Sequence, residues 1–300
     1  MPQVRANGID IEYESFGRAS DPLILLIMGF AAQLIFWPDP LCEGLAAKGF
    51  RVVRFDNRDI GNSTHFAGQS APDPRALLAE VTAGRRPDVP YTLDDMADDA
   101  LGLMDALGTK RAHVVGASMG GMIAQLVAIN HPDRAKSLIS IMSTTGRRDL
   151  PAGNPQTLSV LFRPPSSDSR NDLIEASLLV QRALSSPGFP VSEAEMNARA
   201  ERRTDRAPFD LAGLARQSAA LIVAPPRNAL LRQVRCPTLV LHGADDPVIP
   251  AAAAKDTAES IPGAELVIVP GMGHDIPAGL VPTLVKHISD FVAKVEARAV

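Results

Sequence analysis

Short apolar runs without polar alternation recur along this chain and alternate with helix-like segments. Residues 23–28 (LILLIM) form such a run, as expected for a strand that is covered on both faces. Residues 51–55, 113–115 and 137–142 repeat the feature, and residues 92–107 between them place apolar side chains at helical spacing. This alternation predicts an α/β fold built on a mainly parallel sheet.

The two ends of the chain extend this organisation. Asn7-Gly8 suits a tight turn between two antiparallel strands, because residues 9–14 alternate apolar and polar side chains. Strands are expected again at residues 238–241 and 265–269, followed by a final helix over about 280–297.

The segment from about Gly146 to Arg232 lacks any apolar strand run. Helices are expected there over residues 173–184, 193–206 and 211–223. We therefore expect a core domain made of residues 1–146 and 230–300, with residues 147–229 forming a helical insertion over one end of the sheet.

Residues 116–120 read GASMG, a G-x-S-x-G sequence between a predicted strand and a predicted helix. A serine at such a turn is held in a strained backbone conformation that lifts its hydroxyl clear of the sheet. The flanking glycines remove side chains that would collide across the turn. This context predicts that Ser118 is a nucleophile, whereas the bare pattern could equally be a simple turn.

A serine hydroxyl needs a base to take its proton. His274 follows the predicted strand 265–269 on a glycine-rich loop, at the strand end where active sites of parallel sheets lie. A carboxylate should orient this base, and Asp245 and Asp246 both follow the strand 238–241. Adjacent side chains point in different directions, so only one of the two is expected to reach His274.

Backbone N–H groups should stabilise the negative charge that develops on the substrate oxygen. Met119 follows the nucleophile and supplies one such donor. The loop after the strand 23–28 should supply the second, and Phe30 is the expected donor.

Composition excludes several classes of partner. The net charge is -4 and the isoelectric point is near 5.9, so neither nucleic acid nor an anionic membrane is an expected partner. The arginines between residues 199 and 206 are interleaved with acids and are expected to form a solvated helix face.

Cys42 and Cys236 have no metal-binding spacing and are expected to be free thiols. No leader or membrane span is visible, which predicts a cytoplasmic location.

Several motifs together resemble the α/β-hydrolase superfamily in order and spacing. They are MGF at residues 28–30, DNRDIGNS at 56–63, GASMG at 116–120, GADDPVIP at 243–250 and GMGH at 271–274. The entry loop, WPD at 37–39 and the stretch 56–59 are similar to the branch that contains aclacinomycin methylesterase and related carboxylesterases. Two positions depart from the family: Met28 stands where His is usual, and Asp59 replaces the first glycine of D-x-R-G-x-G-x-S.

The resemblance implies an α/β-hydrolase fold, with a mostly parallel eight-stranded sheet and a helical cap over residues 147–229. It also implies that Ser118, Asp246 and His274 form a catalytic triad, with Phe30 and Met119 as oxyanion donors. Asp246 is selected because the family's acid is the third residue after the strand-ending glycine, Gly243.

These features predict a serine esterase that cleaves an uncharged, fairly small ester without a cofactor or metal. Apolar cap residues, namely Leu178, Leu179, Leu214 and Leu221, are expected to line its pocket. The same triad could instead serve a carbon–carbon bond hydrolase, a lactonase or a perhydrolase, since fold does not determine the reaction. A non-catalytic receptor on this fold is a further alternative, and either a monomer or a homodimer is compatible with the sequence. Epoxide hydrolase and haloalkane dehalogenase activities are disfavoured, because the resemblance implies Asp at the elbow of those relatives.

Overall fold

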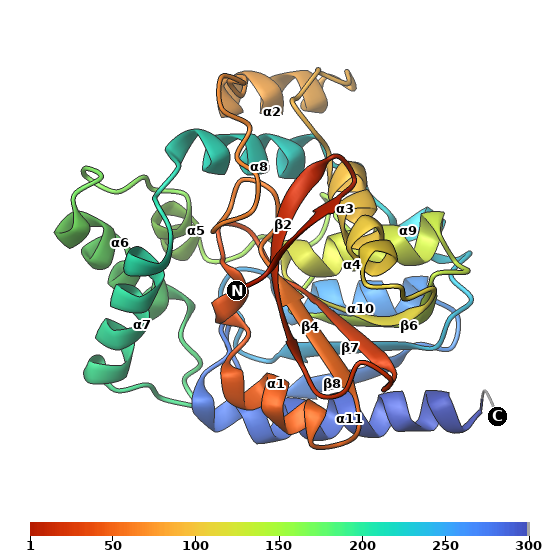
Figure 1. Cartoon of the computed structure of the whole chain (residues 1–300). Coiled ribbons are helices and arrows are strands. Elements are labelled where there is room, and N and C mark those ends of the chain that lie inside the picture. Colours follow the sequence, from red (N-terminus) through yellow and green to blue (C-terminus); the bar gives the residue numbers. More distant parts are fainter. Residues whose placement is uncertain (299–300) are drawn as a thin grey trace.

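The computed structural model describes residues 1–298, whose strands form an eight-stranded sheet (Figure 1). In spatial order the strands are β1 (Gln3–Ala6), β2 (Ile9–Phe16), β4 (Arg51–Phe55), β3 (Leu23–Ile27), β5 (Ala112–Ala117), β6 (Ala135–Ile141), β7 (Thr238–Gly243) and β8 (Glu265–Val269). Strand β2 pairs antiparallel with β1 and β4, and the remaining pairs are parallel. The predicted α/β-hydrolase fold with a mostly parallel sheet is confirmed.

The antiparallel edge begins with the predicted hairpin. Asn7 and Gly8 have φ values of 47° and 76°, as a two-residue turn between twisted strands requires. In β2, Ile9 and Ile11 are buried while Asp10 between them is exposed. One face of this strand therefore packs on the core, whereas the other is exposed at Asp10 but buried at Glu12.

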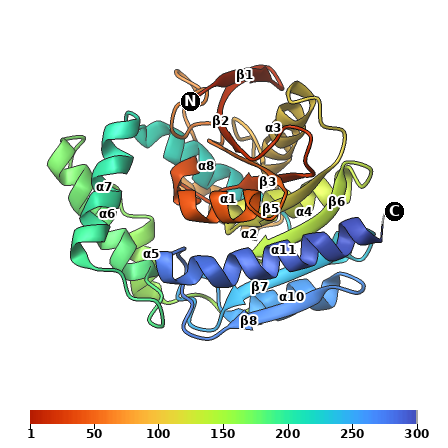
Figure 2. The same cartoon turned by 60° about the horizontal axis from the view of Figure 1, so that its bottom comes forward.

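The central strand β3 shows why its sequence is continuously apolar. All its residues are buried, and alternate side chains enter two separate hydrophobic layers. Leu25 and Ile27 pack with helices α3 (Leu93–Ala106) and α4 (Met119–Asn130) on one face. On the other face, Ile24 and Leu26 pack with α1 (Asp39–Ala46) and α11 (Val281–Ala297). Figure 2 shows α1 and α11 side by side on that face, whereas α10 (Ala251–Ser260) packs on β7 and β8.

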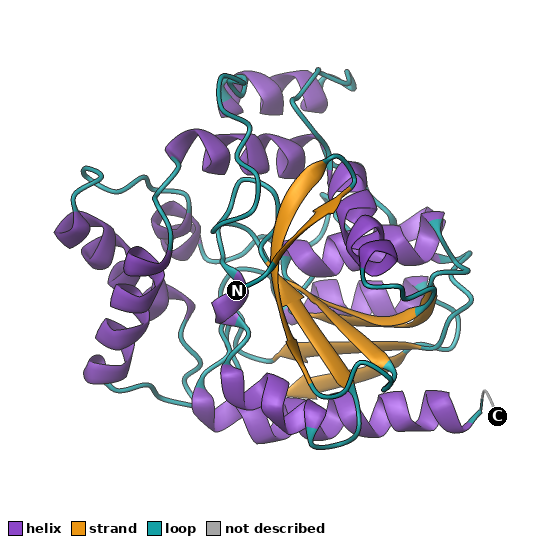
Figure 3. Cartoon of the chain, viewed as in Figure 1, coloured by secondary structure: helices purple, strands orange, loops and turns teal. Residues whose placement is uncertain are grey.

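The segment between β6 and β7 contributes helices to the described structure: α5 (Pro155–Leu161), α6 (Arg170–Leu184), α7 (Glu193–Arg206), α8 (Leu211–Val223) and α9 (Asn228–Leu231). Figure 3 shows most of them grouped to one side of the strands. We call residues 147–229 the helical insertion. Helices α6, α7 and α8 agree with the expectation, whereas α5 was not expected. Asn154 caps α5 through the N–H groups of Gln156 and Thr157.

A second unexpected helix lies in the loop before α3. Helix α2 (Pro74–Thr82) is capped by Asp73, begins with a proline and packs against α8 of the helical insertion. The prolines and glycines around it predicted only a loop, because α2 buries little of its own surface: Leu77 is its one buried residue.

The prediction that the arginines of α7 form a solvated face is wrong. Arg206 forms ion pairs with Glu12 and Asp56 of the core, and its side chain is 10% exposed. Arg202 pairs with Asp39 at the start of α1. The interleaved acids of α7 suggested local pairing, but these partners lie more than 140 residues away in the chain. The arginines therefore dock the helical insertion onto the core.

Two further expectations concern the cysteines and membranes. Cys42 is buried and Cys236 is partly buried, and both are free thiols as predicted. Burial raises the pKa of Cys42 to about 12, so this thiol stays protonated at neutral pH. No helix within residues 1–298 combines the length and the apolar character needed to cross a bilayer.

Candidate active site

Ser118 lies at the sharp turn between β5 and α4. Its φ is 55° and its ψ is −121°, a backbone conformation that L-residues rarely adopt. The turn is held by the Ser118 N–H, which donates to the Ile141 carbonyl at 2.9 Å. The Ser118 carbonyl accepts from the Ser143 hydroxyl at 2.7 Å and from the Gly121 N–H at 2.9 Å. The predicted elbow is therefore present, with the Ser118 side chain at the sheet's carboxyl edge.

The glycines around Ser118 are required by close approaches of the backbone. A Cβ on Gly116 would lie 2.0 Å from the Gly120 carbonyl oxygen. A Cβ on Gly120 would lie 2.0 Å from the Ile27 carbonyl oxygen, and one on Gly121 would lie 2.5 Å from the Ser143 Cβ. No larger residue fits at these positions without moving the strand or the helix, so the turn depends on all of them.

His274 and Asp246 complete a hydrogen-bonded chain that starts at Ser118. The distance from His274 Nε2 to Ser118 Oγ is 3.0 Å, and the distance from His274 Nδ1 to Asp246 Oδ2 is 2.8 Å. His274 follows β8 and Asp246 follows β7, so two neighbouring parallel strands place them at the same edge of the sheet. The backbone N–H of His274 donates to the Leu184 carbonyl at 2.9 Å, which ties its loop to the helical insertion.

The neighbouring aspartates differ in their contacts. Asp246 Oδ1 accepts from the N–H groups of Val248 and Ile249, both at 2.8 Å, while its Oδ2 faces His274. Asp245 is exposed and instead accepts from the Gly271 N–H at 2.8 Å. Only Asp246 reaches the imidazole of His274.

Asp246 has a second histidine neighbour that the sequence reasoning missed. Burial of Asp246 opposes its ionisation, but the charge of His274 and the hydrogen bonds of His242 and His274 lower its pKa to about 2. His242 Nε2 lies 2.7 Å from the Ile249 carbonyl and 3.3 Å from Asp246 Oδ2. Asp246 is therefore a carboxylate over the whole neutral range.

Asp275 is a further carboxyl group next to the site that the sequence reasoning did not single out. Burial raises its pKa to about 6, although a hydrogen bond from the Ser186 hydroxyl and the charges of Arg199 and His274 act in the opposite direction. Ser186 also accepts from the Gly273 N–H at 2.8 Å. The Ser186–Asp275 pair therefore links the helical insertion to the loop that carries His274.

The expected oxyanion donors lie beside Ser118. Met119 is the first residue of α4, where the helix dipole favours negative charge. Phe30 follows Gly29, and a Cβ on Gly29 would lie 3.0 Å from Ser118 Cβ. Among residues 1–298, no hydrogen bond of a turn, loop or helix cap has the Phe30 N–H or the Met119 N–H as its donor. Phe30 also lines the pocket described below.

The β3–η1 loop, residues 28–33, carries Phe30 and precedes the short helix η1 (Leu34–Phe36). Ala31 has a φ of 59°, in the left-handed region that costs free energy for a residue with a side chain. Its N–H donates to Gln217 Oε1 at 3.0 Å, and its carbonyl accepts from Arg203 at 3.3 Å. Gln217 and Arg203 belong to helices α8 and α7, and no local sequence signal links them to Ala31, which lies 186 and 172 residues earlier in the chain.

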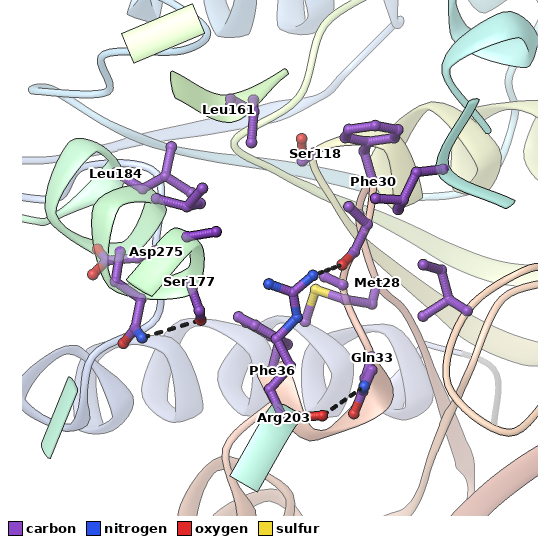
Figure 4. A pocket seen from close by; sticks show the side chains of 18 of the residues that line it. Met28, Phe30, Gln33, Phe36, Ser118, Leu161, Ser177, Leu184, Arg203 and Asp275 are labelled. Atoms are coloured by element: carbon purple, nitrogen blue, oxygen red, sulfur yellow. Dashed lines mark hydrogen bonds between the residues drawn. The ribbon is translucent and has the colours of Figure 1, made fainter. Parts of the chain in front are cut away.

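A pocket of about 1030 Å³ lies between the carboxyl edge of the sheet and the helical insertion (Figure 4). It is lined by Ser118 and His274 and by apolar side chains that include Met28, Phe30, Phe36, Leu161, Leu184 and Leu214. This volume lies at the upper end of the roughly 300–1000 Å³ typical of small-molecule sites, so it exceeds the needs of a small ester.

The expected lining is correct for only one of the predicted leucines. Leu214 lines the pocket, whereas Leu178 does not. Leu179 is 42% exposed, and Leu221 packs against the hydrophobic layer of α3 and α4. Helical spacing shows which residues share a face, but it does not show which face meets the cavity.

One cluster has the residue types of a cation site. Ligand atoms of Asp59, His65 and Asp210 lie within 4.8 Å of one another. However, Asp59 already accepts two hydrogen bonds from Arg216, at 2.8 and 2.7 Å, and one from Tyr91 at 2.7 Å. The Arg216 guanidinium neutralises the acids that a cation would need, so the cluster does not suit a metal ion.

The family of proteins with the alpha/beta hydrolase fold matches residues 22–277. The chain is 30% identical to a rhodomycin D methylesterase from Streptomyces sp. strain C5, in an alignment that covers 88% of each chain. It is 29% identical to a putative carbamate hydrolase from Caulobacter sp. strain K31, covering 86% of each. The enol-lactonase of Burkholderia xenovorans LB400 has a similar structure, with a TM-score of 0.72 and 24% sequence identity. The similarity covers 97% of this chain and 100% of the enol-lactonase chain.

The expected resemblance to hydrolases of the methylesterase branch is confirmed, and so is the expectation of a carboxylic ester hydrolase. The chain belongs to the α/β hydrolase fold family.

Proposed function

We propose that this chain is a serine esterase that hydrolyses a carboxylic ester through an acyl-enzyme on Ser118. The observation that carries the proposal is the continuous chain of hydrogen bonds from Ser118 Oγ through His274 to Asp246, at 3.0 and 2.8 Å. This geometry matches what a serine nucleophile, its base and an orienting carboxylate require.

In the first step Ser118 Oγ attacks the ester carbonyl carbon while His274 Nε2 takes the hydroxyl proton. The C–O bond of the tetrahedral intermediate then breaks, and His274 returns this proton to the leaving alcohol. In the second step water attacks the acyl-enzyme in the same way and releases the carboxylic acid and free Ser118. Asp246 keeps the proton of His274 on Nδ1 and stabilises the imidazolium that forms in each step.

The N–H groups of Phe30 and Met119 are the proposed donors to the oxyanion of both intermediates. Their position beside Ser118 and the absence of other protein acceptors within residues 1–298 support this role. Preorganised donors of this kind are commonly the largest single contribution to such catalysis.

The proposed substrate is an ester with a bulky apolar body, and the helical insertion acts as its cap. The pocket volume of about 1030 Å³ and the apolar side chains from α5 to α8 support both statements. Relatives named as methylesterases favour a methyl ester, in which the small alcohol leaves and the bulky acid fills the pocket.

The test is a panel of methyl esters of increasing acyl size, with lactones and β-diketones of matched size beside them. We expect methanol release from the bulky methyl esters and little turnover of the other classes. Ser118→Ala should abolish this activity, whereas Ser218→Ala, which changes another serine of the pocket lining, should retain it. Preferred turnover of lactones or β-diketones would contradict the proposed reaction, and turnover of none of the three classes would favour a receptor.

A further inference from the structure

Arg203 differs from the other arginines of helix α7 in having no acidic partner. Arg199 pairs with Glu195, and Arg202 pairs with Asp39. Arg206 pairs with two carboxylates of the core. In the part of the chain that the structure describes, no carboxylate lies within 4.0 Å of the Arg203 guanidinium. Its positive charge is therefore unmatched by the protein.

The guanidinium of Arg203 lies inside the pocket. Figure 4 shows it between Ser177 on one side and Met28 on the other, in the same cavity as Ser118. Among residues 1–298, the guanidinium donates one hydrogen bond, to the Ala31 carbonyl at 3.3 Å. Its Cζ lies 6.0 Å from the centre of the Phe36 ring. A guanidinium has five N–H donors, so most of those on Arg203 have no acceptor among residues 1–298.

The backbone of Arg203 is bonded to the β3–η1 loop. Its backbone carbonyl accepts from Gln33 Nε2 at 3.0 Å, which joins α7 to the β3–η1 loop. Burial lowers the pKa of Arg203, and no acidic group opposes that effect. Arg203 is only partly buried, so its unpaired charge remains accessible from the pocket, where an anionic ligand would complete the pair.

We propose that Arg203 binds an ionised carboxylate of the substrate, so that the chain acts on esters that carry a second, anionic group. This inference rests on the proposed esterase function and replaces the sequence-based expectation of an uncharged ester. A single guanidinium matches the single charge and the planar geometry of a carboxylate. Apolar side chains, Met28 and Phe36 among them, line the same pocket, and the lower local dielectric constant strengthens the interaction.

The test compares monomethyl esters of dicarboxylic acids, from succinate to suberate, with methyl esters of monocarboxylic acids of the same chain length. We expect at least one dicarboxylic monoester to lose about 10- to 100-fold in kcat/KM in Arg203→Gln, mainly through KM. Neutral esters should change less than about threefold, and Arg203→Lys should recover part of the loss. Arg163→Gln removes a positive charge from the exposed rim of the same pocket and should leave the preference unchanged.

An equal loss for charged and neutral esters would make Arg203 a support of the β3–η1 loop and would overturn the proposal. Unchanged kinetics of Arg203→Gln with both the charged and the neutral esters would also overturn the proposal. If the wild type cleaves no ester of either series, the esterase proposal fails instead. In that case, calorimetric titration of Ser118→Ala with suberate and its shorter homologues tests directly whether Arg203 binds a carboxylate. Binding that disappears in the Ser118→Ala, Arg203→Gln double variant supports the carboxylate site, and binding of none of these dianions contradicts it.

Discussion

Gln217→Leu tests whether the helical insertion holds the oxyanion loop in place. Gln217 is fully buried, and its amide accepts from the Ala31 N–H at 3.0 Å and donates to the Arg58 carbonyl at 2.9 Å. Leucine fills a similar volume but bonds to neither group. Each buried group left unpaired costs about 1–3 kcal/mol, and two groups lose their partner, so we expect the free energy of unfolding to fall by roughly 2–6 kcal/mol.

The effect on catalysis should exceed the effect on binding. The buried Gln217 side chain, which accepts from the Ala31 N–H at 3.0 Å, holds Ala31 at a φ of 59°, and Phe30 precedes it directly. Loss of an entire oxyanion donor lowers kcat by roughly 100- to 1000-fold. A loosened donor should lower kcat by about 10- to 100-fold, with a smaller change in KM, because the oxyanion exists only after attack has begun.

Gln125→Leu is the matched control for this experiment. Gln125 is equally buried, and it bonds to Arg227 and to the Thr144 carbonyl, away from the β3–η1 loop. Both variants should lose stability in denaturant unfolding, but only Gln217→Leu should lose kcat in ester hydrolysis at a temperature where both remain folded. Activities of the two variants within about threefold of each other would refute the proposed role of Gln217.

Three further outcomes are expected. Asp246→Asn should lower kcat by up to about 10,000-fold in ester hydrolysis because it reverses the tautomer of His274, whereas Asp245→Asn should cost little; the opposite ranking would contradict the assignment. The raised pKa of Asp275 means that the folded protein keeps a proton that the unfolded chain releases, so stability falls as pH rises from about 4 to about 6. Denaturant unfolding should show that Asp275→Asn avoids up to about 3 kcal/mol of this fall, and parallel curves of unfolding free energy against pH for the two proteins would argue against it. Leu214→Phe should shift acyl-size preference towards shorter esters in the substrate panel, while Leu179→Phe, at an exposed position outside the pocket lining, should not; equal profiles would place Leu214 outside the substrate's path.

The sequence predicted the parts of the fold and site that depend on local signals. Continuous apolar runs located the parallel strands, and the glycines around Ser118 located the turn that places its hydroxyl at the sheet edge. Strand ends predicted the positions of His274 and Asp246, because parallel strands bring their carboxyl ends together.

The parts that sequence reasoning missed depend on partners that are distant in the chain. The arginines of α7 were interpreted from their neighbouring acids, but Arg206 pairs with Glu12 and Asp56. Gln217 looks like any polar residue of an amphipathic helix until Ala31 is placed beside it. The expectation that the leucines of the helical insertion line the pocket rests on their apolar character, which does not orient a helix towards a cavity.

Covalent labelling with a fluorophosphonate tests the central claim that Ser118 is the nucleophile. The wild-type protein should take up one phosphonyl group, and peptide mass mapping should place it on Ser118. Ser118→Ala should stay unlabelled and lose ester hydrolysis, while Ser218→Ala should be labelled as fast as the wild type. Modification of a different serine would contradict the account. So would a folded Ser118→Ala variant that retains more than about a tenth of the wild-type kcat, because this corresponds to a barrier change of only about 1.4 kcal/mol.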